Sequence, residues 1–321
     1  MKPMKLAPVF KDYLWGGVRL KEEFNKQSDL DIVAESWELS THPDGESRVL
    51  SGAYQGLTLQ DYLNQVGYSV LGTACENQKE IPILIKFIDS KQSLSIQVHP
   101  NDEYAKRVEQ DQGKTEMWLI LDCDENASLY YGVKEEISKE EFKARIEQNT
   151  ILDVLNKVSV KKGDVFFIEA GTIHAIGAGI IILEIQQSSN STYRIYDYNR
   201  KDAKGNLREL HIDKALDVTN LMPSIHDYVA QGDVESYEGH TSQLLRRCEY
   251  FTTVKYIVSS HVNLNVTTTS FQSIILTEGS GQLVYQNDVI EVQKGDSLFI
   301  PAQDAEYELK GSLEFVLTYV E

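Results

Sequence analysis

The sequence of 321 residues predicts a mainly β protein that contains two β-barrels. Beyond about residue 235 the chain consists almost entirely of short apolar-alternating segments separated by turn residues, as in antiparallel barrels and sandwiches. The segment KGDVFFI at 162–168 recurs as KGDSLFI at 294–300, so one turn and strand is present twice. Helical periodicity is confined to a few earlier segments. We therefore expect an N-terminal domain over 1–235 with helical insertions and a C-terminal domain over 236–321.

Composition restricts the possible functions. Apolar residues make up 41% of the chain, which is enough for a substantial core. The net charge of −18 argues against a nucleic-acid-binding surface, because such a surface needs a basic footprint. A phosphorylated ligand would have to meet a local group of Lys or Arg side chains. The three cysteines, Cys75, Cys123 and Cys248, are far apart and odd in number, which favours reduced thiols over a disulfide framework.

The sequence predicts a cytoplasmic protein without a membrane segment. No stretch reaches the roughly 18 apolar residues that a transmembrane helix needs. Residues 1–10, MKPMKLAPVF, lack the apolar run of a signal peptide. The sequence makes no prediction of the oligomeric state.

The first hundred residues contain mostly strands. Residues 1–55 read as short β segments with turns. A helix is predicted over 57–67, LTLQDYLNQVG, with Thr58 as its N-cap. The nearly continuous apolar run at 81–90 predicts a buried strand, and the alternation at 93–100 predicts the next one.

The middle of the chain combines two helices with further strands. A short helix is expected over 101–110, and a longer helical segment over 138–158, where Ser138 and Glu141 form a capping box. Strands are predicted at 114–123, 127–133, 160–171 and 180–189.

The repeat predicts which residues the two barrels share. Extending the match without gaps places His174 on Glu306. Aligning EMWLILD with FQSIILT places Glu116 opposite Phe271. We therefore expect the C-terminal barrel to keep the strand scaffold and to lack a metal site.

Four residues in the first half indicate one metal site: Gln97, His99, Glu116 and His174. Strand side chains alternate faces, so Gln97 and His99, two apart, should point the same way. Two imidazole nitrogens with Gln and Glu oxygens, and no thiolate, suit one zinc ion with room for water or substrate. Either histidine alone would more simply be a core residue; the joint pattern favours a site.

Three further polar residues accompany this set. Lys114 and Ser95 lie two residues before Glu116 and Gln97, so each should share the face of its neighbour. A lysine beside a cation can act as a base or bind phosphate, although most lysines are simply solvated. Ser95 could donate to a phosphate or satisfy a strand end. Arg194, in a polar and tyrosine-rich segment, suits a phosphate or sugar lip, but Arg is also common at strand ends.

The motifs SIQVHPND, GKTEMW and GTIHAIGAGIIILEIQQSSNSTYRIYD, with the earlier LWGG and ESWELSTHP, resemble type I phosphomannose isomerase (mannose-6-phosphate isomerase) in its short bacterial form. The resemblance extends over essentially the whole chain. It implies a mainly β fold of two cupin-like β-barrel (jelly-roll) domains, with a few helices inserted in or packed on the N-terminal one. It also implies a bound zinc ion and interconversion of mannose 6-phosphate and fructose 6-phosphate.

The resemblance assigns roles by position. The family's zinc ligands correspond to Gln97, His99, Glu116 and His174, its active-site lysine and arginine to Lys114 and Arg194, and a serine near the substrate phosphate to Ser95. One substrate-site position departs from the pattern, because Asn190 stands where the family usually has aspartate. If that aspartate transfers protons, this chain would be slower or would rely on another group such as Lys114.

The expected reaction is an aldose–ketose isomerisation through a cis-enediol, with Arg194 stabilising charge. The base stays open between Lys114, Glu116 and zinc-bound water. Three alternatives also stay open: a cupin-type sugar-phosphate-binding protein with little turnover, an isomerase of another phosphosugar, and a metal-dependent oxygenase. The oxygenase would prefer iron held by two histidines and one carboxylate.

Overall fold

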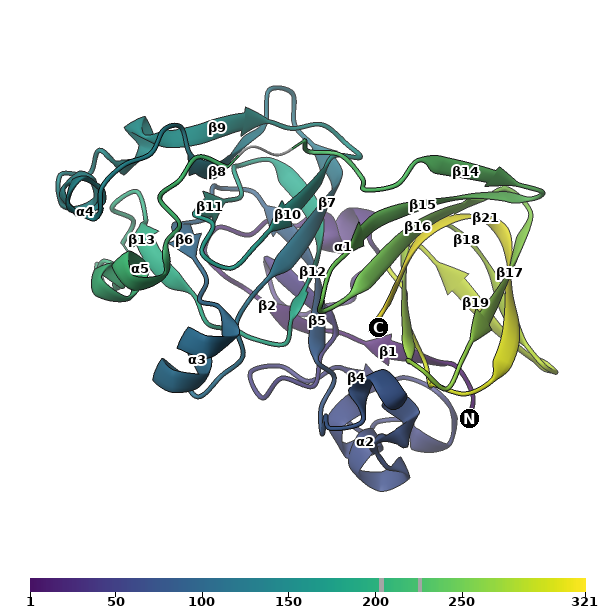
Figure 1. Ribbon diagram of the computed structural model, residues 1–321. Coiled ribbons are helices and arrows are strands. Elements are labelled where there is room, and N and C mark those ends of the chain that lie inside the picture. Colours follow the sequence, from purple (N-terminus) through teal and green to yellow (C-terminus); the bar gives the residue numbers. More distant parts are fainter. Residues whose placement is uncertain (202–204, 225–226) are drawn as a thin grey trace. The chain divides into compact units, whose positions relative to one another are not determined.

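The computed structural model in Figure 1 describes residues 1–201, 205–224 and 227–321. It is mainly antiparallel β structure, as predicted. Two compact units divide the chain: unit 1 is Met1–Asp12, Val18–Phe87 and Val229–Glu321, and unit 2 is Tyr13–Gly17 and Ile88–Tyr228. The predicted domains 1–235 and 236–321 divide the chain differently and stay a prediction. Within the described ranges, no helix is long and apolar enough to cross a membrane.

Unit 1 contains a ten-stranded sheet in the order β14-β15-β16-β21-β18-β20-β1-β4, with β17 added on β21 and β19 on β18. Its strands are β1 (Met4–Ala7), β4 (Arg48–Val49), β14 (Val234–Tyr237), β15 (His240–Arg247), β16 (Thr252–Val258), β17 (His261–Val266), β18 (Gln272–Tyr285), β19 (Asp288–Gln293), β20 (Ser297–Ile300) and β21 (Ala305–Tyr319). The C-terminal part of the chain is therefore made of strands, as its sequence predicts.

The remaining elements of unit 1 come from the N-terminal part of the chain. They are β2 (Val9–Lys11), α1 (Arg19–Glu23), β3 (Glu35–Leu39), η1 (Gly52–Tyr54), α2 (Leu59–Val66), η2 (Tyr68–Leu71) and η3 (Thr73–Cys75). Strand β5 (Ile83–Ser90) is completely buried, and its residues divide between the two units.

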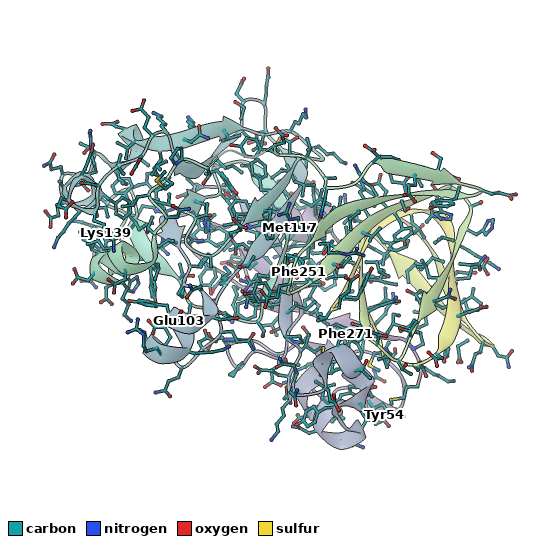
Figure 2. All side chains as sticks on the ribbon, in the orientation of Figure 1. Tyr54, Glu103, Met117, Lys139, Phe251 and Phe271 are labelled. Atoms are coloured by element: carbon teal, nitrogen blue, oxygen red, sulfur yellow. The ribbon has the colours of Figure 1, made fainter. Side chains whose placement is uncertain are left out.

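In its described residues, unit 2 contains two groups of strands and three α-helices. One group has the order β10-β7-β12, and the other has the order β13-β6-β11-β8-β9. The elements are β6 (Ile96–Val98), α3 (Asp102–Val108), β7 (Glu116–Cys123), β8 (Ser128–Val133), α4 (Lys139–Glu147), η4 (Ile151–Asp153), β9 (Leu155–Ser159), β10 (Val165–Ile168), β11 (His174–Ala175), β12 (Ile180–Gln187), β13 (Tyr193–Tyr196) and α5 (Ile212–Val218). In Figure 2, Met117 of β7 lies inside, whereas Glu103 and Lys139 are on the outer surface.

The five-stranded sheet of unit 2 has one apolar face and one polar face. On β6, Ile96 and Val98 join an apolar cluster with Phe142 and Ile146 of α4 and Ala215 of α5. Because strand residues alternate, the residues between and beside them must face the other way. The same alternation holds on β11 and β13. The helices therefore cover one face, and the other face is left for polar side chains.

The predicted helix starts are confirmed, and one predicted helix is too long. Thr58 and Ser138 each accept a hydrogen bond from the backbone N–H three residues later, as N-caps do. The helix predicted over 138–158 ends at Glu147, and its last part is strand β9. Asn149, with φ of 57°, lies in the left-handed region just after α4 and breaks the helical run.

The internal repeat is a real structural repeat. We name β10-β7-β12 the first module and β20-β18-β21 the second module. The amide of Gly163 donates to the carbonyl of Ile120 at 2.8 Å, and that of Gly295 donates to Leu276 at 2.8 Å. The two glycines have φ values of 93° and 91°, which other residues rarely adopt. The same turn therefore starts both copies of the shared strand.

Strand register corrects one predicted correspondence. In the first module Ile168 pairs with Glu116, and in the second Ile300 pairs with Gln272. Glu116 therefore corresponds to Gln272, and the predicted match to Phe271 is wrong by one residue. The sequence alignment matched the isoleucines and leucines of the two segments, whereas the turn sets the strand register. The difference matters because a shift of one residue moves a side chain to the opposite face.

Candidate metal centre

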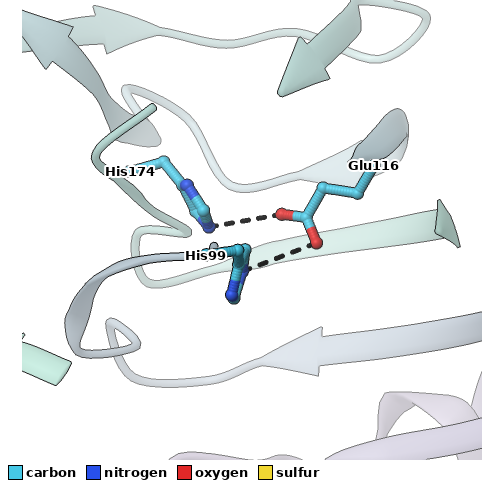
Figure 3. Close-up of side chains that lie close together, drawn as sticks. All are labelled: His99, Glu116 and His174. Atoms are coloured by element: carbon cyan, nitrogen blue, oxygen red, sulfur yellow. Dashed lines mark ion pairs between the residues drawn. The ribbon is translucent and has the colours of Figure 1, made fainter. Parts of the chain in front are cut away.

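Three buried side chains converge in unit 2 (Figure 3). The Nε2 atom of His174 lies 3.2 Å from Oε1 of Glu116, and Nε2 of His99 lies 3.7 Å from Oε2 of the same carboxylate. The exposed fraction is 1% for His99 and 0% for the other two residues. One potential ligand atom from each residue lies within 4.8 Å of the others. This is a compact group of two imidazoles and one carboxylate, shielded from water.

The strand pattern brings these residues together. Glu116 begins β7, where it pairs with Ile168 on one side and Gln186 on the other. His174 begins β11 and pairs with Gln97 of β6. Both histidines lie on the polar face left free by the helices. The two groups of strands each supply part of the centre.

Each imidazole is oriented by a backbone carbonyl. Nδ1 of His174 lies 2.8 Å from the carbonyl oxygen of Thr172, and Nδ1 of His99 lies 2.9 Å from that of Ser191. A carbonyl can only accept, so both Nδ1 atoms carry the proton and both Nε2 atoms keep a lone pair. The two lone pairs are therefore available in the centre, as in histidine metal ligands.

Burial controls the charge of these groups. It lowers the pKa of His174 to about 4, so this imidazole is neutral at neutral pH. Burial also raises the pKa of Glu116, and the nearby Lys114 opposes that rise. Nζ of Lys114 lies 2.9 Å from Oε2 of Glu116. A cation in the centre would favour the ionised carboxylate further.

Gln97 lies in a row across three strands. On one side it pairs with His174, and on the other side with Arg194 of β13. Its amide nitrogen is 3.4 Å from Nε2 of His174. Directly opposed strand residues share a face, so Arg194 borders the centre. The guanidinium of Arg194 donates to the carbonyl of Glu209 at 2.9 Å.

The remaining predicted residues occupy different positions. Lys114 is buried just before β7, and Ser95 is buried just before β6 on the side of Gln97 and His99. Asn190 is exposed in the loop between β12 and β13, next to the Ser191 carbonyl that accepts from His99. Six of the eight predicted residues therefore lie in the row of paired strand residues or in direct contact with the centre: Gln97, His99, Lys114, Glu116, His174 and Arg194. Ser95 and Asn190 lie next to segments that lead into the centre.

Sequence reasoning missed Glu184. Its Oε1 atom is 3.8 Å from Nζ of Lys114 and accepts a hydrogen bond from Nε1 of Trp118 at 3.1 Å. Glu184 is 3% exposed and lies in the middle of β12. A single acid within the aliphatic run IIILEI was the available signal, because a buried charge needs a partner or a role.

A second missed group follows β13. Arg200 and Arg208 both pair with Asp197, and the Arg208 contact is 2.6 Å long. The pKa of Arg194 is lowered by burial and then by the positive charge of Arg208. Arg194, Arg200 and Arg208 outnumber the nearby acids Asp197 and Glu209, which leaves a small local positive charge in a chain of net charge −18. Such local charge is what the acidic composition requires for a phosphate.

The residues present fit a divalent metal ion. Both carboxylate oxygens of Glu116 are buried: Oε2 lies 2.9 Å from the ammonium of Lys114, and Oε1 lies 3.2 Å from the Nε2 lone pair of His174. A carboxylate oxygen and a nitrogen lone pair this close together repel each other in a buried site unless a cation lies between them. Neutral imidazoles with a carboxylate and no thiolate are a donor set for zinc and for several other transition metals.

The antiparallel modules and the buried histidine–carboxylate centre define a protein of the cupin class with a candidate metal site. Residues 4–115 match the family described as phosphomannose isomerase type I, catalytic domain, and residues 240–320 match the mannose-6-phosphate isomerase cupin domain.

Full-length relatives identify the family. The mannose-6-phosphate isomerase ManA of Bacillus subtilis is 38% identical over 99% of both chains, and the mannose-6-phosphate isomerase of Streptococcus mutans is 35% identical over 99% of this chain and 98% of its own. A crystal structure of the mannose 6-phosphate isomerase from Bacillus subtilis matches all of both chains with a TM-score of 0.92 and 34% identity. The chain belongs to the type I phosphomannose isomerase family, which confirms the resemblance seen in the sequence.

Proposed function

We propose that this protein interconverts mannose 6-phosphate and fructose 6-phosphate, with one zinc ion held by Gln97, His99, Glu116 and His174. The buried centre of His99, Glu116 and His174 beside Lys114 is the observation that carries this proposal. Bound zinc would act as a Lewis acid on the sugar oxygens next to the reacting carbons. Full-length relatives that are named mannose-6-phosphate isomerases support the choice of substrate.

The reaction moves one proton between neighbouring carbons and needs no oxidant. A base removes the proton from C2 of the aldose while the carbonyl oxygen gains a proton, which gives the cis-enediol. The O2 hydroxyl then loses its proton as C1 gains one, which gives the ketose. The chain must therefore supply a base close to C1 and C2 and stabilise negative charge on the oxygens.

Lys114 and Glu184 are the pair that we assign to proton transfer. Nζ of Lys114 lies between Oε2 of Glu116 at 2.9 Å and Oε1 of Glu184 at 3.8 Å. With Glu116 assigned to the metal, Glu184 is the carboxylate that we assign to proton exchange with the ammonium. Glu184 would also offset the replacement of the family's usual aspartate by Asn190, because Glu184 is a second acid at the proposed site.

Substrate binding is assigned to the polar residues around the centre. Arg194 would stabilise charge on the sugar, and Ser95 would donate its hydroxyl to the phosphate. Asn190, exposed on its loop, would contact the substrate as a neutral hydrogen-bonding group. The positive charge around Asp197 would attract the phosphate at short range.

A coupled assay tests the proposal. Mannose 6-phosphate, other hexose 6-phosphates and free mannose are offered to the zinc-loaded protein, to the protein treated with a chelator, and to that protein after zinc is restored. We expect turnover of mannose 6-phosphate that the chelator abolishes and zinc restores. Turnover of another hexose 6-phosphate alone would show a different isomerase. Tight binding without turnover in the zinc-loaded protein would show a binding protein.

We infer that the strand groups of unit 2 belong to one cupin-like barrel and that strands β15 to β21 form the other, with domains over 1–235 and 236–321. The repeated turn supports this inference. Cytoplasmic location stays a prediction.

A further inference from the structure

We propose that Asp111 is a positioning residue of the metal centre, which fixes the carbonyl of Ser191 and, through it, the ring of His99. The inference rests on the proposed function only in requiring that the centre binds a metal. Asp111 lies in the segment after α3 and contacts neither histidine in the described structure.

Asp111 closes a small network of hydrogen bonds on the loop between β12 and β13. Its Oδ2 atom accepts from the hydroxyl of Ser189 at 2.9 Å and from the hydroxyl of Ser191 at 2.8 Å. The amide of Ser191 donates back to the Ser189 hydroxyl at 3.2 Å. One carboxylate thus holds two residues of the loop in a fixed relation.

The held segment carries the acceptor for His99. The Ser191 carbonyl is 2.9 Å from Nδ1 of His99, and this contact leaves Nε2 directed toward Glu116 at 3.7 Å. If the carbonyl moved, the ring could rotate or change its tautomer, and the Nε2 lone pair would be lost from the centre. Asp111 therefore acts on the metal through a backbone group that no side-chain substitution can remove.

The two histidines differ in how their acceptors are held. His174 donates to Thr172, only two residues away in the same turn, so the acceptor is fixed by local backbone geometry. His99 donates to a residue 92 positions away, on a loop without regular structure. Only the distant acceptor needs a clamp. Asp111 supplies that clamp to His99 and has no counterpart role at His174.

The segment that carries Asp111 is itself anchored beside the site. The amide of Gly113 donates to Oδ1 of Asp102 at 2.8 Å, and the amide of Lys114 donates to the carbonyl of Pro100 at 3.0 Å. A Cβ atom at Gly113 would lie 2.4 Å from the backbone nitrogen of Asp102, so the segment packs tightly against the start of α3. The position of Asp111 is thereby tied to the chain that leaves His99.

The test is a zinc-affinity measurement on four variants. Asp111→Ala, Ser191→Ala, the double variant and Asp217→Asn compete with a chromophoric chelator for zinc, and the melting temperature of each metal-free protein is recorded. Asp217 is the matched control, because its exposed carboxylate accepts the hydroxyl of Tyr104 at 2.9 Å without a link to His99. Ser191→Ala keeps the backbone carbonyl and removes only the contact with Asp111.

We expect Asp111→Ala to weaken zinc binding about tenfold, the lower end of the effect of residues that orient metal ligands. Ser191→Ala should weaken it less, because Ser189 remains, and the double variant should match Asp111→Ala because both act on one link. Asp217→Asn should bind zinc as the original protein does.

Three results would overturn the inference: unchanged zinc affinity in Asp111→Ala, additive losses in the double variant, or a loss in Asp111→Ala matched by Asp217→Asn. If Asp111→Ala does not fold, Ser191→Ala alone decides, and an unchanged affinity there overturns the inference. Zinc binding without isomerisation in the original protein would refute the proposed function and leave this inference standing, whereas absence of any zinc binding would refute both.

Discussion

The two modules share one backbone arrangement, but their inward-facing side chains differ in polarity. In each, a glycine at φ near 90° donates to the central strand, and an aspartate accepts from the backbone three residues earlier: Asp164 from Lys161 at 2.9 Å and Asp296 from Gln293 at 2.8 Å. Even the register irregularity is shared, since the central strand skips one residue after Ile120 in the first module and after Leu276 in the second.

The inward-facing residues differ. Strand register places Glu184 opposite Trp118 in the first module, and Leu317 opposite Ile274 in the second. Ile274 and Leu317 belong to an apolar cluster with Leu298 and Ile300, whereas Glu184 contributes to the polar centre. The turn and the hydrogen-bonded register therefore build the scaffold, and the side chains on one face determine whether that face forms an apolar core or a polar site.

The largest expected difference concerns His174 and Glu306, which the gapless sequence match places at the same position. His174→Ala should reduce isomerase activity to background, because the variant lacks one proposed metal ligand, the Nε2 atom of His174. Glu306→Ala should leave kcat/KM unchanged, since Glu306 is exposed on the second module. The coupled assay measures both variants. Substantial turnover in His174→Ala would contradict the claim that, of the two modules, only the first contributes to a catalytic centre.

A loss of two to four orders of magnitude is expected for Lys114→Ala. Positioned acid–base groups typically contribute about 10²- to 10⁴-fold. The loss should fall on kcat, with zinc still bound, because Lys114 contacts Glu116 without belonging to the ligand set. Lys161→Ala is the matched control, since its side chain is 86% exposed. Near-normal kcat in Lys114→Ala would remove this residue from the mechanism.

Changing the polarity of an inward-facing residue should affect the free energy of unfolding differently in the two modules. Leu317→Glu would place a carboxylate in the apolar cluster, which we expect to cost several kcal/mol, of order 3 to 5 as for an unpaired buried charge. Glu184→Gln keeps an acceptor for Trp118 and should change the free energy of unfolding by less than about 1 kcal/mol, while lowering kcat. Denaturant titration compares the two variants. Equal stabilities would contradict the assignment of the two interiors.

The smallest contrast involves the repeated glycines. Gly163→Ala should cost about 1 to 2 kcal/mol for the left-handed backbone alone, because a Cβ atom there meets nothing within 4 Å. Gly295→Ala should cost more, since its Cβ would lie 1.9 Å from the carbonyl oxygen of Phe24. Thermal unfolding of both variants provides the measurement. A larger loss at Gly163 would show that the turns are packed differently.

The sequence predicted the residues of the centre because period-two alternation is a strong local signal. Gln97 and His99 share a face on any strand, and the repeated turn fixed where His174 could lie. Glu184 escaped notice because its partner, Lys114, is 70 positions away in the chain, and only strand pairing brings them together. Asp111 was missed for the same reason, since it acts through hydroxyls of a distant loop.

The fold class was predictable, and element boundaries less so. Caps at Thr58 and Ser138 depend on a few neighbouring residues, so they were found correctly. The end of α4 was misplaced, because residues 155–158 have apolar spacing compatible with a helix, yet they pair with β8 as strand β9. The match of Glu116 to Phe271 failed because register depends on the turn and on the partner strand.

Metal content tests the central claim most directly. Elemental analysis of the protein purified in the presence of zinc should find one zinc per chain in the original protein and in Glu306→Ala, and little in His174→Ala. A full complement of zinc in His174→Ala, or iron in place of zinc in the original protein, would contradict the proposed centre.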